Sequence, residues 1–147
     1  MRVTVTGATG LIGTRLVAAL ARRGDEVTVL SRDPARARER LGSGIDAERW
    51  DPLHEPAPAS ALAGRDGVIH LAGEPVAQRW SAAAKERIRT SRESGTANLV
   101  AGLRSAEPRP RVLASASAVG YYGPRGEEEV PESTPPSEGF LADVCVA

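Results

Sequence analysis

Five short apolar runs recur along this chain, separated by segments long enough to hold a helix or a loop. Each run has four or five residues and is bounded by Gly, Pro or polar residues, and all but the third, Ala47 to Trp50, are rich in Val, Ile or Leu. Runs of this length and composition predict buried strands. The expected strands are residues 3–6, 26–30, 47–50, 67–71 and 111–115.

The segments between these strands carry helix signals. A first amphipathic helix is closed by Gly24. Asp33 as N-cap and Pro34 as first helical residue predict a short Arg-rich helix that ends near Leu41. Ser81 is the expected N-cap of a long helix. The side chains expected to face the core are Leu11, Leu16, Val17 and Leu20 in the first helix, and Ile88, Leu99, Val100 and Leu103 in the long one.

Strands that alternate with helices predict a parallel sheet with right-handed crossovers. We therefore expect an α/β fold with a five-stranded parallel sheet over residues 1–147. The Pro-containing segments 51–60 and 123–139 are expected to be loops. Ligands of such sheets bind at the carboxyl ends of the strands.

Three glycines spaced three residues apart follow the first strand directly. Gly7 can take the tight turn, Gly10 lets a pyrophosphate approach the backbone, and Gly13 allows close packing of helix and strand. The free N–H groups that open the helix favour a negative charge. The same glycines could form a turn without a ligand, but their place between a strand and an amphipathic helix favours dinucleotide binding.

Composition removes several other classes of function. The 147 residues carry 19 basic and 19 acidic side chains, so no net field attracts nucleic acid or an anionic membrane. All basic residues except Lys85 are Arg, which we interpret as coding bias. The single cysteine, Cys145, excludes an internal disulfide, and no apolar run approaches the ~20 residues of a membrane span. We expect a soluble, cytoplasmic protein.

Four motifs, at residues 6–13, 70–73, 91–99 and 115–123, together resemble the extended short-chain dehydrogenase/reductase superfamily. Residues 50–52, 79–80, 115–123 and 140–145 are more narrowly similar to its nucleoside-diphosphate-sugar epimerase-like branch, within the NAD-dependent epimerase/dehydratase superfamily. The resemblance implies a Rossmann-type doubly wound sheet, here with five strands in the order 3-2-1-4-5. Members are about twice as long, so it also implies a partial dinucleotide-binding domain that is apparently truncated and lacks the substrate-binding part.

The resemblance implies a set of cofactor-binding positions at the strand ends. Asp51 would meet the adenine amino group, although it could simply open the Pro52 turn. Gly73 would let the backbone lie against the ribose and pyrophosphate, although close strand–helix packing would use the same residue. The full set is Gly7, Thr9, Gly10, Leu11, Ile12, Gly13, Ser31, Arg32, Asp51, Leu71, Ala72, Gly73 and Ser115.

The end of the second strand bears on which cofactor is bound. Enzymes that take NAD place an acid there to hold the ribose 2′-hydroxyl, and here the strand ends in Ser31 and Arg32. An Arg fork suits a 2′-phosphate, so we expect NADP. NAD remains the alternative cofactor if the Asp33 carboxylate turns inward instead of capping the helix.

The resemblance assigns polarisation of the substrate oxygen to a Ser or Thr after the fifth strand, here Ser117 with Ser115 as runner-up. Its proton donor is a Tyr with a Lys four residues later, but Phe140-Leu141 and Val144-Cys145 stand at those places. Tyr122 or Tyr121 could substitute. The chain is therefore an NADP-binding epimerase or oxidoreductase-like enzyme of unknown small substrate, or an inactive nucleotide-binding module that acts through a protein partner.

Three remaining side chains invite simpler interpretations. His70 lies in an apolar strand with no second metal ligand at suitable spacing, so we expect a buried, hydrogen-bonded imidazole. His54 is expected to be solvated. Trp80 could line a substrate cleft or cover the start of the long helix.

Assembly is expected from the surfaces that the partial fold leaves open. The fifth strand would lack a following neighbour, and the face of the long helix with Ile88, Leu99 and Leu103 would lack a packing helix. We therefore expect self-association, with a homodimer as its ordered form.

Overall fold

The computed structural model describes residues 1–147 as two compact units, Met1–Ser115 and Ala116–Ala147. The first unit contains a parallel five-stranded sheet in the order β3-β2-β1-β4-β5, which confirms the expected topology. The order reverses between β1 and β4, which is where doubly wound sheets bind ligands. The strands are β1 (Arg2–Thr6), β2 (Glu26–Ser31), β3 (Asp46–Arg49), β4 (Gly67–His70) and β5 (Val112–Ser115).

Both predicted N-caps are present. The Asp33 carboxylate accepts a 3.0 Å hydrogen bond from the Arg36 amide, and the Ser81 hydroxyl accepts a 3.1 Å bond from the Ala84 amide. These caps satisfy amides that have no partner within the helix. The helices of the first unit are α1 (Leu11–Arg22), α2 (Pro34–Leu41), α3 (Ala59–Leu62) and α4 (Ala82–Ser105).

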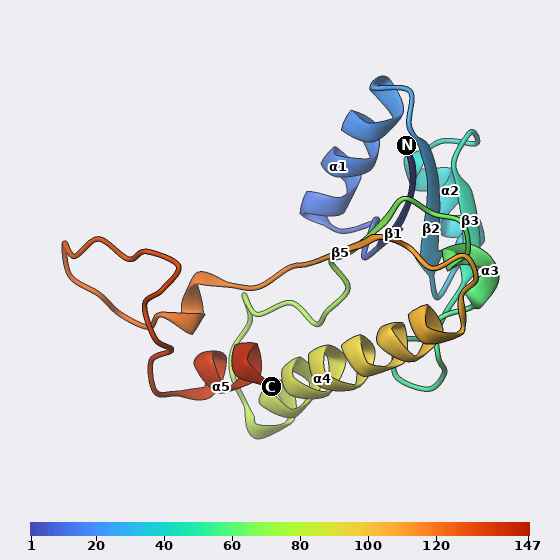
Figure 1. Cartoon of the computed structure of the whole chain (residues 1–147). Coiled ribbons are helices and arrows are strands. Elements are labelled where there is room, and N and C mark those ends of the chain that lie inside the picture. Colours follow the sequence, from blue (N-terminus) through green and yellow to red (C-terminus); the bar gives the residue numbers. More distant parts are fainter. The chain divides into compact units, whose positions relative to one another are not determined.

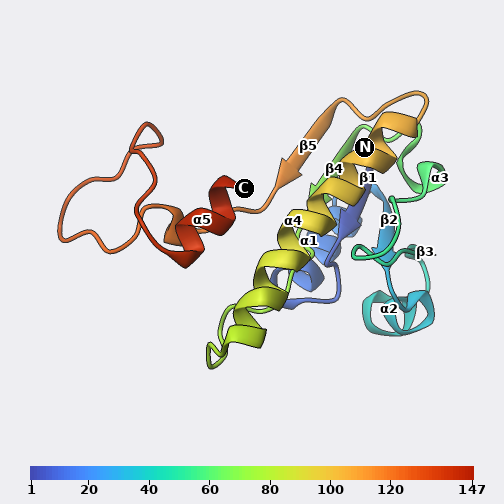
Figure 2. The ribbon, with the colours of Figure 1, turned by 90° about the horizontal axis from the view of Figure 1, so that it is seen from below.

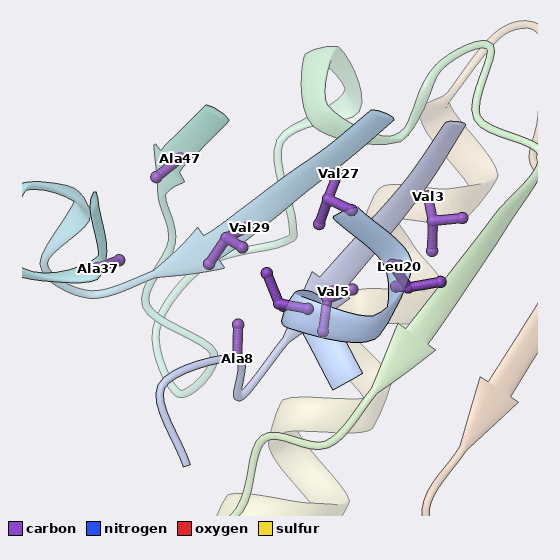
Figure 3. Close-up of a cluster of buried hydrophobic side chains, with 9 residues drawn as sticks. Val3, Val5, Ala8, Leu20, Val27, Val29, Ala37 and Ala47 are labelled. Carbon is purple, nitrogen blue, oxygen red and sulfur yellow. The ribbon is translucent and has the colours of Figure 1, made fainter. Parts of the chain in front are cut away.

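Helices cover both faces of the sheet (Figures 1 and 2). Along β1 the side chains alternate, so Val3 and Val5 join the core beneath α1 and α2 while Thr4 and Thr6 face the opposite side. Figure 3 shows the first of these cores, with Leu20 of α1 beside the valines of β1 and β2. The second core lies beneath α3 and α4 and includes Leu30, Trp50, Ala57, Ala61, Leu62, Val68, Leu99 and Ala106.

The structure corrects three details of the sequence prediction. The expected loop 51–60 runs into α3, a single turn whose Ala61 and Leu62 are buried in the second core, so packing decides a helix that its Pro-rich flank conceals. Leu11 was expected to face the core but is 74% exposed, because the first turn of α1 lies at the carboxyl edge of the sheet. In α4, Ile88 and Leu99 are fully buried as expected, whereas Val100 and Leu103 are only half-buried.

The second unit has little regular structure of its own. It contains the 3₁₀ turn η1 (Val119–Tyr121) and the helix α5 (Phe140–Val146), and residues 123–139 between them form neither helix nor strand. The Ser137 amide donates a 2.8 Å hydrogen bond to the Tyr121 carbonyl and so fastens this loop to η1. No helix of either unit has the length and apolarity that crossing a bilayer requires.

Candidate cofactor site at the carboxyl edge of the sheet

The turn after β1 depends on glycine because of its conformation and its neighbours. Gly7 has φ +66°, and a Cβ built there would lie 2.5 Å from the Leu71 carbonyl carbon and 2.7 Å from the Ala72 nitrogen. No side chain fits at those distances, and the left-handed conformation disfavours other residues. The turn therefore lies directly against the backbone that follows β4.

The next two glycines differ in what surrounds them. A Cβ at Gly13 would lie 2.4 Å from the Gly7 oxygen, so Gly13 is required for the turn itself. A Cβ at Gly10 would lie 3.3 Å from the same oxygen, which is tight but not prohibitive. Gly10 is exposed, and it therefore keeps the outer surface of the turn flat.

The first turn of α1 is open to a ligand. Gly10 is its N-cap and provides no side-chain hydrogen bond, so the first amides of the helix have no capping partner. Thr9 is partly exposed at this turn, and the Leu11 and Ile12 side chains are exposed beside it. Unpaired amides at a helix N-terminus suit a phosphate group.

At the end of β2 the Arg32 guanidinium and the Asp33 carboxylate have different surroundings. Asp33 caps α2 through its carboxylate, and its amide donates a 3.2 Å hydrogen bond to the Ser31 hydroxyl. Its carboxylate is therefore engaged by the helix. Arg32 is exposed, and its positive charge acts on two carboxylates, Asp51 after β3 and Glu74 after β4.

Asp51 forms the turn that follows β3. Its carboxylate lies 2.9 Å from His54 Nδ1 and accepts a 3.1 Å hydrogen bond from the Leu53 amide, so the turn-opening role is present. The His54 hydrogen bond is the largest cause that lowers the pKa of Asp51, followed by the Leu53 amide, with the Arg32 charge adding less. Asp51 is thus an ionised acceptor at the sheet edge.

The segment after β4 is held from two sides. Leu71 and Ala72 each donate an amide hydrogen bond of 3.2 Å to the Thr6 hydroxyl. On the other side, the Arg92 guanidinium donates a 3.0 Å bond to the Glu74 carbonyl and lies 3.2 Å from where a Gly73 Cβ would be. Gly73 therefore serves the close packing against α4 that the sequence left as an alternative.

The structure brings part of the predicted cofactor set together. Gly7, Leu71 and Ala72 are in direct backbone contact. Ser115 is exposed at the end of β5, and its register partner in β4 is His70. His70 is itself buried and hydrogen-bonded, as the sequence predicted.

Thr6, Ser91 and Arg92 were missed by sequence reasoning although they position this site. Ser91 accepts a 2.9 Å hydrogen bond from the Glu74 amide, beside the Arg92 contact. Their signal was present, because Thr6 opens the glycine motif and Ser91-Arg92 opens the third motif. Spacing alone did not show what they contact.

The two candidate catalytic residues share a hollow within the second unit. Ser117 and Tyr122 line a space of about 460 Å³. Glu132 also lines it, and nothing in the sequence marked this carboxylate within a Pro-rich loop. The remaining lining residues are Ala118, Val119 and Tyr121.

His54 and Trp80 fall outside these arrangements. His54 is largely exposed and contacts Asp51. Trp80 lies before α4, where its indole N–H donates a 2.8 Å hydrogen bond to the Val76 carbonyl and the Lys85 ammonium lies 6.0 Å from its ring centre. Trp80 therefore covers the start of the long helix.

Comparison with known proteins identifies a matching family and several relatives. Residues 3–142 match the NAD dependent epimerase/dehydratase family. The chain is 38% identical to the chloroplastic epimerase family protein SDR39U1 homolog of Arabidopsis thaliana, over 99% of this chain and 42% of that protein.

Solved structures agree with this result. Human epimerase family protein SDR39U1 (isoform 2) with NADPH is 30% identical with a TM-score of 0.79, over 99% of this chain and 46% of that one. The nucleoside-diphosphate sugar epimerase of Corynebacterium glutamicum is 36% identical with a TM-score of 0.76, over 99% of this chain and 29% of that one. The chain thus spans less than half the length of these relatives.

Proposed function

This chain belongs to the NAD dependent epimerase/dehydratase family, and we propose that it binds NADP(H) across the carboxyl edge of β1, β2 and β4. The pyrophosphate would lie at the uncapped start of α1, where Gly10 leaves room for it. The ribose would lie along Leu71 to Gly73, and the ionised Asp51 would accept from the adenine amino group. When bound, the nicotinamide would supply a hydride.

The preference for NADP over NAD is carried by one observation, the capping bond of Asp33. One oxygen of its carboxylate accepts the Arg36 amide, so the side chain is held as the cap of α2, which favours capping over the inward position that NAD would need. Arg32 then remains as the charged residue at the end of β2 and offers a planar set of donors to a 2′-phosphate. The NADPH named for the human relative is consistent with this preference.

The test is a calorimetric titration of wild type and Arg32→Ala with NADPH and with NADH. A charge-assisted hydrogen bond contributes roughly 1.5–3 kcal/mol, so the substitution should weaken NADPH binding about tenfold or more and leave NADH nearly unchanged. Arg40→Ala is the matched control, because Arg40 is an exposed arginine in the last turn of α2. Equal losses for both cofactors in Arg32→Ala would contradict the NADP assignment.

The hollow of the second unit supports a choice of residues for the enzyme alternative. In an epimerase or oxidoreductase acting on a small polar substrate, Ser117 would polarise the substrate oxygen and Tyr122 would hold the proton.

A second function, a nucleotide-binding module that works through a protein partner, is favoured by Phe140. This residue opens α5 at the place of the expected proton donor and has no ionisable group.

A further inference from the structure

We propose that His70 and Thr6 are positioning residues for the cofactor, the imidazole fixing the direction of the Thr6 hydroxyl and that hydroxyl fixing the Leu71–Ala72 backbone. The inference rests on the proposed function only for the identity of the ligand that this backbone meets. Neither residue touches the cofactor in this arrangement. They act through the shape of the turn.

The Thr6 hydroxyl is the centre of the network. Its oxygen lies 3.2 Å from the Leu71 nitrogen, 3.2 Å from the Ala72 nitrogen and 2.7 Å from His70 Nδ1. The Leu71 amide also reaches the Thr6 carbonyl at 3.2 Å, so the Ala72 amide depends on the hydroxyl more than the Leu71 amide does. Thr6 is fully buried, so no water competes for these bonds.

The geometry assigns the tautomer of His70. The Leu71 and Ala72 amides can only donate to the Thr6 hydroxyl oxygen, so neither can accept its proton. Among these partners only His70 Nδ1 can accept the Thr6 proton, and we assign this nitrogen as unprotonated. The imidazole proton is then on Nε2, 3.4 Å from the Thr96 hydroxyl of α4, to which it donates.

The surroundings keep the imidazole neutral. It meets Thr6 from β1, Thr96 from α4 and, at 6.3 Å between ring centres, Trp50 after β3. None of these three is titratable near neutral pH. Burial is the cause that lowers the pKa of His70 below its ordinary 6.5.

The charged side chains of α4 near His70 form their hydrogen bonds and ion pairs with other groups. Among the α4 residues close to Thr96, Arg92 donates to the Glu74 carbonyl and Glu93 accepts from Arg89. The loop after β4 adds Glu74, which pairs with Arg87. The proton on His70 is therefore governed by burial and by the Thr6 bond.

Protonation would break the network at a defined place. A proton on Nδ1 would deprive the buried Thr6 hydroxyl of its acceptor and add a third donor beside its oxygen. The Leu71 amide would keep the Thr6 carbonyl, whereas the Ala72 amide would have to share the hydroxyl oxygen with the imidazolium. The backbone against Gly7 would loosen, and cofactor affinity would fall with it.

The first test measures NADH affinity by fluorescence titration between about pH 8 and about pH 5, on both sides of the ordinary histidine pKa. NADH is the probe because the 2′-phosphate of NADPH has its own pKa of about 6 and would titrate in the same range. We expect wild type to lose affinity tenfold or more as the pH falls below 6.5. His70→Asn places an uncharged oxygen near Nδ1 and should bind with a flat pH profile. His70→Leu and Thr6→Val should bind weakly at every pH, whereas Thr6→Ser should follow wild type.

Folding is followed by circular dichroism under the same conditions. Because the pKa of His70 is lowered on folding, its contribution to stability is complete above pH 6.5 and is lost as the pH falls toward the folded-state pKa. Affinities are therefore compared only where each variant is folded. A fall in affinity that persists in folded His70→Asn would overturn the inference.

The second test needs no cofactor. Nitrogen-15 spectra of the imidazoles, with His70→Asn to identify the His54 signals, should show the His70 proton on Nε2 at about pH 8. Thr6→Val should also speed hydrogen exchange of the Ala72 amide. A proton on Nδ1, or unchanged exchange, would overturn the inference even if NADPH binds. Failure of wild type to bind either cofactor would overturn the proposed function and leave these spectra to decide the positioning roles.

Discussion

At the residue scale, three glycines of one motif meet different physical demands. Gly7 is required by its positive φ and by the Leu71 backbone, and Gly13 by the Gly7 oxygen. Gly10 has the least crowded position of the three in this structure. The proposed function assigns the absence of a side chain at Gly10 to the approach of the pyrophosphate, which separates its role from those of the other two.

This difference gives a prediction for Gly10→Ala and Gly13→Ala. In Gly10→Ala the new Cβ lies 3.3 Å from the Gly7 oxygen, so we expect the melting temperature to stay within a few degrees of wild type, as for a change below about 1 kcal/mol. NADPH affinity should nevertheless fall at least about tenfold, because the methyl group stands where the pyrophosphate approaches.

Gly13→Ala is the contrasting variant. Its Cβ would lie 2.4 Å from the Gly7 oxygen, so the turn must move and unfolding should become easier by about 1–3 kcal/mol. Thermal melts and NADPH titrations on both variants separate the roles. Undiminished binding by folded Gly10→Ala would remove the pyrophosphate from this turn.

At the element scale, α4 approaches the rest of the unit through small residues. A Cβ on Gly102 would lie 2.2 Å from the Ala57 carbonyl oxygen, whereas one on Gly95 would lie 3.6 Å from the Pro52 side chain, an ordinary contact. The same helix also accepts the Ala57 amide at the Asn98 carbonyl. The segment after β3 is therefore seated against α4.

Alanine at these two positions should have effects of opposite sign. Gly102→Ala must displace the backbone at Ala57, which we expect to cost about 1–3 kcal/mol in the free energy of unfolding. Gly95→Ala fills an ordinary contact and improves helix propensity, so it should be neutral or stabilising by up to about 1 kcal/mol. Urea melts of the two variants measure this, and similar losses in both would contradict the close approach at Gly102.

At the scale of the whole molecule, β5 is the exposed part of the sheet. It ends the strand order, and Val112 and Leu113 are 61% and 39% exposed. Of the three side chains expected on an open face of α4, Ile88 and Leu99 are fully buried and Leu103 is half-buried. We therefore assign the expected self-association of the chain to β5 and not to α4.

We predict that the chain self-associates through this edge, with a homodimer as its ordered form. Unpaired backbone groups and exposed apolar side chains favour pairing with a second strand. Sedimentation at tens of micromolar, about the range in which weak interfaces form, should show a species larger than the monomer. Val112→Lys should shift it toward monomer, and a stable wild-type monomer would contradict the prediction.

A further expectation at this scale is that the chain binds its cofactor but transfers no hydride. General acid–base catalysis contributes about 10²–10⁴-fold, and Phe140 cannot supply it. Stopped-flow absorbance of bound NADPH with a panel of carbonyl compounds and sugar nucleotides should show no substrate-dependent oxidation. Oxidation that disappears in Ser117→Ala would instead establish the enzyme.

The strands, both helix caps and the glycine turn were predictable from the sequence because they rest on local signals, whereas the strand order came from the family resemblance. Apolar runs, Asp33 before Pro34 and the glycine spacing each act within a few residues. α3 was not predictable, since its four residues are helical only where Ala61 and Leu62 pack in the second core. Tertiary packing overrides weak propensity in such short elements.

The same division holds for the site. The sequence alone determined that a dinucleotide-type turn follows β1. It also determined that β2 ends in Ser31 and Arg32 and not in an acidic residue. Whether Asp33 caps or turns inward was decided only by the fold, through its bond to the Arg36 amide. The Thr6–His70–Thr96 network joins three elements far apart in the chain, and hydrogen bonds at that range leave no periodic signal in a sequence.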